Sequence, residues 1–299
     1  MKKPGRAISD MLSAGEPILS VEFYPPKTEE GARQILRTAN ALKSFGPDFV
    51  SITYGAGGST RERTLDYGEL MQEIFGFEVM PHLTCVGHSR EELKGILERF
   101  KETGFRNIMT LRGDPPKGKT DFVPHPDGLS YGSELVAFIR EHFPHFCLGV
   151  GGYPEKHPEA PSLEVDLGHL KHKVDQGADF ITTQLFFSNA DFLSFQEKCR
   201  ALGIEVPIVP GILPALSFDQ VTKFCGFCQA SLPEELSKRL EAVKDDEAAS
   251  LEVGVDWAHQ QIKELFEQGA PGVHLYILNR SASALALVER LYADGLLKG

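Results

Sequence analysis

The stretch CLGVGGYPEKHPEAPSLEVDLGHLKHKVDQGADFITTQ, residues 147–184, contains one complete strand–helix–strand unit. Its ends, Cys147–Gly151 and Asp179–Gln184, are short runs of mainly apolar and β-branched residues, the pattern of parallel strands covered on both faces. Between them, one apolar helical face carries Leu163, Leu167, Leu170 and Val174. The stretch therefore predicts a strand, a helix and a second parallel strand.

The same alternation recurs about eight times along the chain. The other strand-like runs are Ile18–Phe23, Asp48–Thr53, Glu78–Thr84, Asn107–Leu111, Val206–Gly211 and Gly272–Leu278. Ser89 and Glu92 form a capping box that marks the start of one intervening helix. Eight such units in one chain of this length favour a closed (β/α)8 TIM barrel over an open doubly wound sheet, which usually has fewer strands. We predict one catalytic barrel over residues 1–299, with its core at about 16–295 and a small charged helical insertion at Phe224–Ser250, before the last strand.

Composition excludes several classes of protein. The 299 residues carry 31 Lys and Arg against 42 Asp and Glu, a net charge of −11, which disfavours binding to nucleic acid. No apolar run is long enough to cross a bilayer, and the basic N-terminus lacks the apolar stretch of a signal peptide. We therefore expect a cytoplasmic protein, without membrane association, whose five cysteines are reduced.

Polar residues stand where nearly every predicted strand ends. They are Glu22, Thr53, Tyr54, His82, Thr84, Arg112, Asp114, Tyr153, Gln184 and Tyr276. In a barrel these ends meet on the rim where active sites lie. An inert core would not need such a ring of polar groups, so the pattern predicts an active site.

Glu22 is the first candidate for acid–base chemistry. Val21, Phe23 and Tyr24 surround it in the sequence, and partial desolvation would raise its pKa and suit a general acid. The alternative is that Glu22 forms an ion pair with Arg112 that merely neutralises the barrel mouth.

Two further segments carry weaker signals. Thr53–Thr60 contains three glycines between a strand and a helix, which could admit a ligand close to the backbone or form a plain βα turn. The Gln184 amide offers a donor and an acceptor, as the edge of a pterin or purine requires. The following Phe186 and Phe187 could wall a planar ligand or belong to the core.

Eight segments together resemble the methylenetetrahydrofolate reductases, in their bacterial flavoprotein form. The matching segments are Val21–Lys27, Ser51–Ala56, Pro81–Cys85, Leu111–Asp114, Gly152–Ala160, Thr183–Phe187, Pro210–Pro214 and Tyr276–Arg280. They occur in the order and spacing of that family, and the run YPEKHPEA at 153–160 is especially specific.

The resemblance implies an oxidoreductase of one-carbon metabolism that binds FAD. It would take hydride from NADH or NADPH and reduce 5,10-methylenetetrahydrofolate to 5-methyltetrahydrofolate by ping-pong chemistry. The implied catalytic residues are Glu22, which would protonate the folate at N10, and Asp114, between flavin and pterin. The implied substrate-binding residues are Glu22, Thr53, Asp114, Gln184, Gln220, Phe224 and Arg280. The implied FAD contacts are Tyr54, Ala56, His82, Arg112, Gly113, Asp114, Tyr131, Gly132, Tyr153, His157, Ala160, Asp166, His169, His172 and Lys173.

Some of these residues also have simpler interpretations. Asp166, His169 and Lys173 share one polar helical face, which could be no more than a solvated surface. Gln220 makes an S-x-x-Q capping box with Ser217. His169, His172 and Gly132 also depart from the residues expected in relatives, which leaves individual cofactor contacts open.

Cys225 and Cys228 form a lone C-x-x-C in a helical stretch, and we interpret them as helical cysteines without chemistry, since structural zinc needs four ligands. We predict no metal. The family also implies a homo-oligomer. The chain ends soon after the eighth unit, so the C-terminal regulatory domain of eukaryotic members, and inhibition by S-adenosylmethionine, are not expected.

Two alternative functions remain, and a third is disfavoured. One is a flavin-free pterin-binding methyltransferase component, and another is a reductase subunit of a larger complex that uses a different electron donor. A Schiff-base aldolase would need a desolvated lysine at a strand end, and none of the eight predicted ends carries one.

Overall fold

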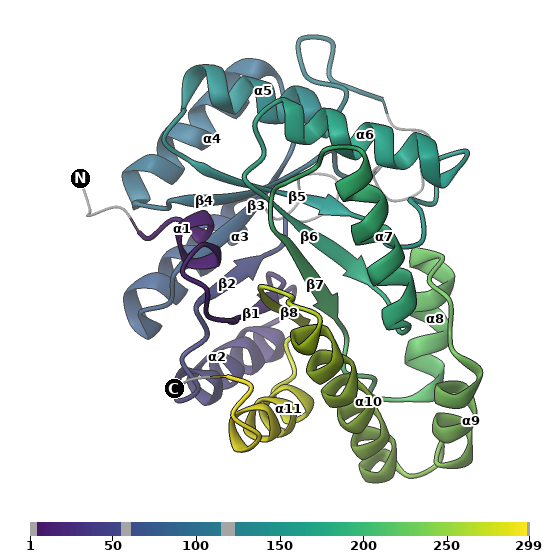
Figure 1. The fold of residues 1–299 in the computed structure, drawn as a ribbon. Helices are drawn as coiled ribbons and strands as arrows, with labels where there is room; N and C mark the ends of the chain where they lie inside the picture. The colour runs from purple at the N-terminus through teal and green to yellow at the C-terminus, as the bar shows by residue number, and fades with distance from the viewer. Residues whose placement is uncertain (1–4, 55–60, 115–122, 298–299) are drawn as a thin grey trace.

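Eight parallel strands close into a barrel in chain order (Figure 1). The computed structural model describes residues 5–54, 61–114 and 123–297. The strands are β1 (Ile18–Phe23), β2 (Phe49–Ile52), β3 (Val79–Thr84), β4 (Asn107–Leu111), β5 (Cys147–Gly152), β6 (Phe180–Leu185), β7 (Ile208–Ile212) and β8 (Gly272–Tyr276). The predicted TIM barrel is therefore confirmed.

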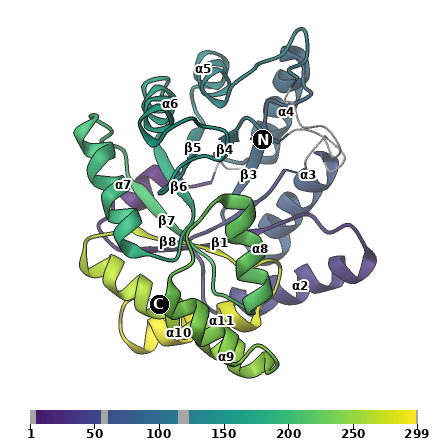
Figure 2. The ribbon, with the colours of Figure 1, turned by 90° about the vertical axis from the view of Figure 1, so that its right-hand side faces the viewer.

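The helices surround the barrel (Figures 1 and 2). They are α1 (Ile8–Leu12), α2 (Glu29–Lys43), α3 (Arg61–Leu70) with the π-helical turn η2 (Met71–Phe75), α4 (Arg90–Thr103), α5 (Gly132–His142), α6 (Leu163–Asp175), α7 (Asn189–Ala201), α8 (Phe218–Cys228), α9 (Glu234–Ala242), α10 (Glu247–Glu267) and α11 (Ala282–Ala293). Helices α8 and α9 are additional elements between β7 and the long helix α10. The insertion predicted at Phe224–Ser250 is thus helical, but it starts six residues too late, because α8 begins directly after its cap at Ser217.

Local sequence sets several helix starts. Ser89 and Glu92 make the predicted capping box at the start of α4, with both reciprocal hydrogen bonds present. Ser162 caps α6 by accepting a hydrogen bond from the Val165 amide. The helix that follows the YPEKHPEA run therefore begins at a defined residue.

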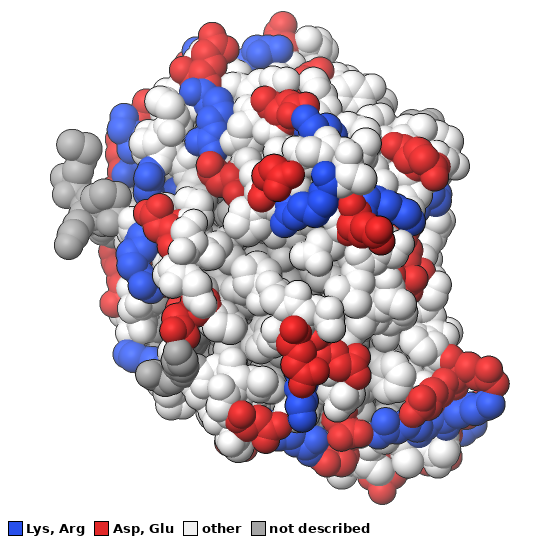
Figure 3. All heavy atoms as spheres, in the orientation of Figure 1, with Lys and Arg blue, Asp and Glu red and all other residues white. Residues whose placement is uncertain are grey.

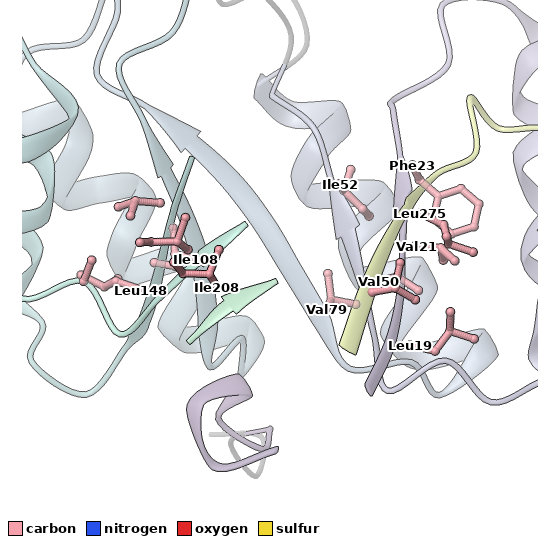
Figure 4. Packing of buried hydrophobic residues seen from close by; sticks show 14 of the residues in the cluster. Leu19, Val21, Phe23, Val50, Ile52, Val79, Ile108, Leu148, Ile208 and Leu275 are labelled. Carbon is pink, nitrogen blue, oxygen red and sulfur yellow. The ribbon is translucent and has the colours of Figure 1, made fainter. Parts of the chain in front are cut away.

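Two separate apolar clusters hold the barrel. The larger lies between the strands and the outer helices; Figure 4 shows part of it, including Val21, Val50 and Leu275. The smaller fills the interior near the amino ends of the strands, where Phe49 and Phe180 meet Ile8 and Met11 of α1. Helix α1 therefore closes this end of the barrel with apolar side chains.

Acidic and basic side chains are intermixed on the face drawn in Figure 3. Within the described ranges, no helix combines the length and apolarity that a membrane span requires.

Gly254 of α10 is a position where backbone segments approach closely. A Cβ placed there would lie 1.8 Å from the Ala215 carbonyl oxygen, which belongs to the backbone after β7. We predict that Gly254→Ala lowers the free energy of unfolding by about 3 kcal/mol or more, because one of the two segments must shift. Denaturant unfolding followed by circular dichroism measures this change.

Gly95→Ala in α4 is the matched control. Gly95 is exposed, and a Cβ there would meet nothing within 4 Å. This variant should gain about 0.5–1 kcal/mol from helix propensity. Equal effects of the two substitutions would contradict the close approach at Gly254.

Candidate active site

A cavity of about 480 Å³ opens at the carboxyl ends of the strands. This volume lies in the usual range for small-molecule sites. Thirteen residues predicted from the sequence line it: Glu22, Thr53, Tyr54, His82, Arg112, Gly113, Asp114, Gly132, Tyr153, His157, Lys173, Gln184 and Phe224. Residues as far apart in the sequence as Glu22 and Phe224 therefore line one cavity.

Other predicted residues lie outside this lining. They are Tyr131, Ala160, Asp166, His169, His172, Gln220 and Arg280. Asp166 stands just behind the lining, since its carboxylate accepts a hydrogen bond from the His157 amide at 2.8 Å. Tyr131, His169, His172 and Arg280 are exposed, and Ala160 is buried. Ala56 lies outside the described residues.

Glu22 faces two histidines and not an arginine. Its Oε2 lies 3.5 Å from Nε2 of His82 and 3.7 Å from Nε2 of His274. Arg112 instead forms a bidentate pair with Glu159, at 2.6 and 2.7 Å. The alternative of a Glu22–Arg112 ion pair is therefore wrong.

The expected rise in the pKa of Glu22 is also wrong. Burial does raise this pKa, but His274, the charge of His82 and the Ser51 hydroxyl together outweigh burial and lower it. The sequence neighbours of Glu22 indicate the desolvation, but its partners come from other strands, which closure of the barrel brings beside it.

His82 shows the opposite balance. Burial lowers its pKa to about 4, against the opposing charge of Glu22. Only 8% of the residue is exposed, so the neutral ring is strongly favoured.

Sequence reasoning missed His274. Its Nδ1 lies 2.8 Å from Ser20 Oγ, and its Nε2 lies 3.4 Å from Ser51 Oγ. A histidine between Val273 and Leu275 in a buried strand is the only signal in the sequence, and it fits an ordinary core histidine equally well. Its significance follows from the pairing of β8 with β1.

Three buried polar atoms of the cavity wall lack hydrogen-bond partners within the described structure. They are Nε2 of His82, Oγ1 of Thr84 and Oγ1 of Thr182. Buried polar groups in proteins are nearly always paired. The wall therefore matches a ligand that carries hydrogen-bonding groups along its edge.

Lys173 reaches the cavity from α6. Its Nζ donates to the Gly151 carbonyl at 2.6 Å, and burial lowers its pKa to about 8, with the Asp166 charge opposing. The predicted polar face of α6 is thus divided. Asp166 and Lys173 turn toward the β5–α6 loop and the cavity, while His169 remains exposed.

The end of β8 has an unusual backbone. Leu278 and Asn279 have φ values of 51° and 56°, a conformation that is unfavourable for leucine. The Asn279 side chain both accepts from the Tyr24 amide at 3.0 Å and donates to the Tyr24 carbonyl at 2.8 Å. This pair joins the ends of β1 and β8 beside the cavity, and the turn explains why β8 ends two residues before the predicted Leu278.

Helix α8 forms another side of the cavity. Ser217 accepts from the Gln220 amide, and Gln220 Oε1 accepts from the Leu216 amide at 3.0 Å. Ser217 therefore caps the helix as predicted. The Gln220 side chain binds the amide of Leu216, one residue before the Ser217 amide that a standard capping box would use. Cys225 and Cys228 lie within α8 as predicted, and Cys228 also lines the cavity. Over the described residues, no three His, Cys, Asp or Glu side chains are arranged to hold a metal.

A closed parallel barrel with a carboxylate, an amide and unpaired polar groups at one rim has the architecture of TIM-barrel enzymes. Within that class, the chain belongs to the methylenetetrahydrofolate reductase family, which it matches over residues 7–292.

Two bacterial relatives match along nearly their whole length. The 5,10-methylenetetrahydrofolate reductase of Pectobacterium carotovorum is 38% identical over 275 residues, 91% of this chain and 89% of the relative. That of Escherichia coli K12 is 36% identical over 277 residues, 93% of this chain and 91% of the relative. The Arabidopsis thaliana protein "Methylenetetrahydrofolate reductase (NADH) 1" is 39% identical over 294 residues, and this chain spans about half (50%) of its length.

A solved structure of low sequence identity shares the fold. It is described as an uncharacterized protein from Clostridium thermocellum that binds two copies of 5-methyl-5,6,7,8-tetrahydrofolic acid. The TM-score is 0.64 at 15% identity, with 97% of this chain and 98% of that chain covered.

His82 makes stability depend on pH. The unfolded chain binds a proton at this residue below about pH 6.5, whereas the folded chain does so only near pH 4. The free energy of unfolding should therefore fall by up to about 3 kcal/mol as the pH is lowered from 6.5 to 4. In a His82→Gln variant this part of the decline should be absent, as denaturant titrations from pH 7 to pH 4 can measure. Parallel curves for both proteins would contradict the burial of a neutral imidazole.

Proposed function

We propose that this chain catalyses the flavin-dependent reduction of 5,10-methylenetetrahydrofolate to 5-methyltetrahydrofolate, with NADH or NADPH as hydride donor. The observation that carries the proposal is the meeting of Glu22, Asp114 and Gln184 in one cavity, in a chain of this family. These residues supply a proton donor, a second carboxylate and a two-way hydrogen-bonding amide for a pterin.

The cavity wall suits FAD. The unpaired atoms of His82, Thr84 and Thr182 fit a ring system with polar edges. We propose that Tyr54, Tyr153, His157 and Lys173 also hold the cofactor, with Arg112 and Asp166 beside them. When bound, FAD would accept hydride from the nicotinamide and pass it to the folate.

Glu22 and His274 are arranged to share one proton. The Ser20 hydroxyl donates to the Val273 carbonyl at 3.2 Å, so its oxygen can accept from Nδ1 of His274. In a neutral ring, Nε2 is then an acceptor that faces Glu22 at 3.7 Å. The Ser51 hydroxyl lies 3.4 Å from the same nitrogen.

This pair can serve a general acid whose resting pKa is low. A bound folate would remove water from the Glu22 side chain, which is 21% exposed, and desolvation favours the protonated carboxyl. Glu22 would then donate the proton to the folate at N10, and His274 would keep the carboxyl oriented. Gln184 lies ready to orient the pterin, since its Oε1 accepts from the Leu185 amide and its NH2 group remains a donor.

Glu22→Gln should separate the two half-reactions. We expect NADH to bleach the flavin at a rate within about twofold of wild type. Reoxidation by methylenetetrahydrofolate should slow by at least about a hundredfold, since general acid catalysis contributes this much. Anaerobic stopped-flow absorbance measures both rates. Glu91→Gln, an exposed carboxylate on α4, is the control.

The same assay tests the alternatives. Loss of both half-reactions in Glu22→Gln would mean that Glu22 is structural. A purified protein without flavin absorbance would favour the pterin-binding methyltransferase component, and a bound flavin that NADH does not bleach would favour a subunit with another electron donor.

His274→Asn should alter the pH dependence of the folate half-reaction. His274 lowers the pKa of Glu22. Its removal should therefore raise the pH above which Glu22 no longer donates a proton and the folate step slows. The NADH half-reaction, measured from pH 5 to pH 9, should keep its wild-type profile. An unchanged folate profile would show that His274 does not act on Glu22.

A further inference from the structure

Helix α8 forms one wall of the cavity. It carries Phe224 and Cys228 in the lining, but Val221 is its one buried residue. Phe227, on the outer side, is 69% exposed. Figure 1 shows α8 and α9 to one side of the strands. Val221 and the partly buried Phe224 pack α8 against an apolar cluster that includes Leu213, and polar contacts at the two ends of the helix add to this packing.

The two ends of α8 are attached differently. At its start, the Ser217 cap and the Gln220–Leu216 contact tie it to its own sequence. Beyond its end, Ser231 is bound across 76 residues of sequence: its amide donates to both carboxylate oxygens of Glu155, at 2.8 and 3.0 Å. The Ser231 hydroxyl also donates to Glu155 Oε2. One carboxylate thus receives two donors of the α8–α9 connection.

Glu155 belongs to the loop that forms the facing wall. This loop, residues 153–160, places Tyr153 and His157 in the cavity, with their rings 4.6 Å apart. It is braced from behind, because the Asp166 carboxylate accepts from the His157 amide. Glu155 therefore links this braced loop to the connection that follows α8.

We propose that Glu155 is a positioning residue, which fastens α8 to the β5–α6 loop through Ser231 and thereby sets the place of Phe224 in the cavity. Its effect on the reaction rests on the proposed function, but the fastening itself does not. Hydrogen bonds to a charged acceptor are stronger than neutral ones. The Glu155 carboxylate consequently restrains α8 more than an amide in the same place would.

Hydrogen exchange tests the fastening without any assay of activity. In Glu155→Gln, amides of residues 218–231 should exchange about five- to tenfold faster than in wild type, because α8 opens more often. Ser231→Ala removes only the hydroxyl donor and should give a smaller rise, about two- to threefold. Glu197→Gln, an exposed carboxylate on α7, should leave this segment unchanged.

Two outcomes of this experiment would overturn the proposal. One is wild-type exchange of residues 218–231 in Glu155→Gln. The other is a rise of equal size throughout the barrel, which would mark a general loss of stability. Trp257 is the one tryptophan, and its Nε1 donates to the Phe187 carbonyl, so its fluorescence checks that each variant is folded. If Glu155→Gln does not fold, the Ser231→Ala result alone decides.

Steady-state kinetics tests the consequence for substrate binding. Glu155→Gln should raise the KM for methylenetetrahydrofolate about five- to tenfold with kcat changed less than about twofold, while the flavin content stays at the wild-type level. Faster exchange without a change in KM would mean that Glu155 holds α8 but does not position the substrate, and it would overturn the positioning role. A wild-type protein with no folate reaction would contradict the proposed function instead and leave the exchange result intact.

Discussion

The pairing of β1 with β8 closes the barrel, and the site depends on this closure. Ile18 to Glu22 lie beside Gly272 to Tyr276 in parallel register. A Cβ on Gly272 would lie 2.4 Å from the Ile18 carbonyl oxygen, so this junction needs a residue without a side chain. Closure places Glu22 next to His274, and it brings the carboxyl ends of all eight strands onto one rim.

The interior of the barrel is divided into an apolar and a polar part. Phe49, Phe180 and the α1 side chains fill the lower end, which stabilises the fold through burial. Above them lie Ser20, Ser51, His82 and His274, all buried. Buried polar atoms without partners lower stability, and among these residues Nε2 of His82 has no hydrogen-bond partner within the described structure. The low pKa of His82 is a consequence of its burial.

The strands were largely predictable from sequence, because buried parallel strands are continuous apolar runs. The predicted limits at Ile18–Phe23 and Asn107–Leu111 match the structure. The limit at Leu278 was wrong because Leu278 and Asn279 turn into the left-handed region. For the site, motifs placed Glu22 and Gln184 in one cavity correctly. The alternative of an Arg112 partner for Glu22 and the expected sign of its pKa change were wrong. Both depend on neighbours from other strands, such as His82 and His274, which are far from Glu22 in the sequence.

By itself, the sequence determined the order of strands and helices, the caps at Ser89 and Ser217, and the family to which the chain belongs, since periodicity, capping and motifs are local properties. Only the tertiary structure decided which side chains share an environment. It paired Arg112 with Glu159, set His274 beside Glu22 and joined Glu155 to Ser231. Charge, burial and hydrogen bonding act through space, so residues far apart in the chain set the protonation of the site and hold its walls.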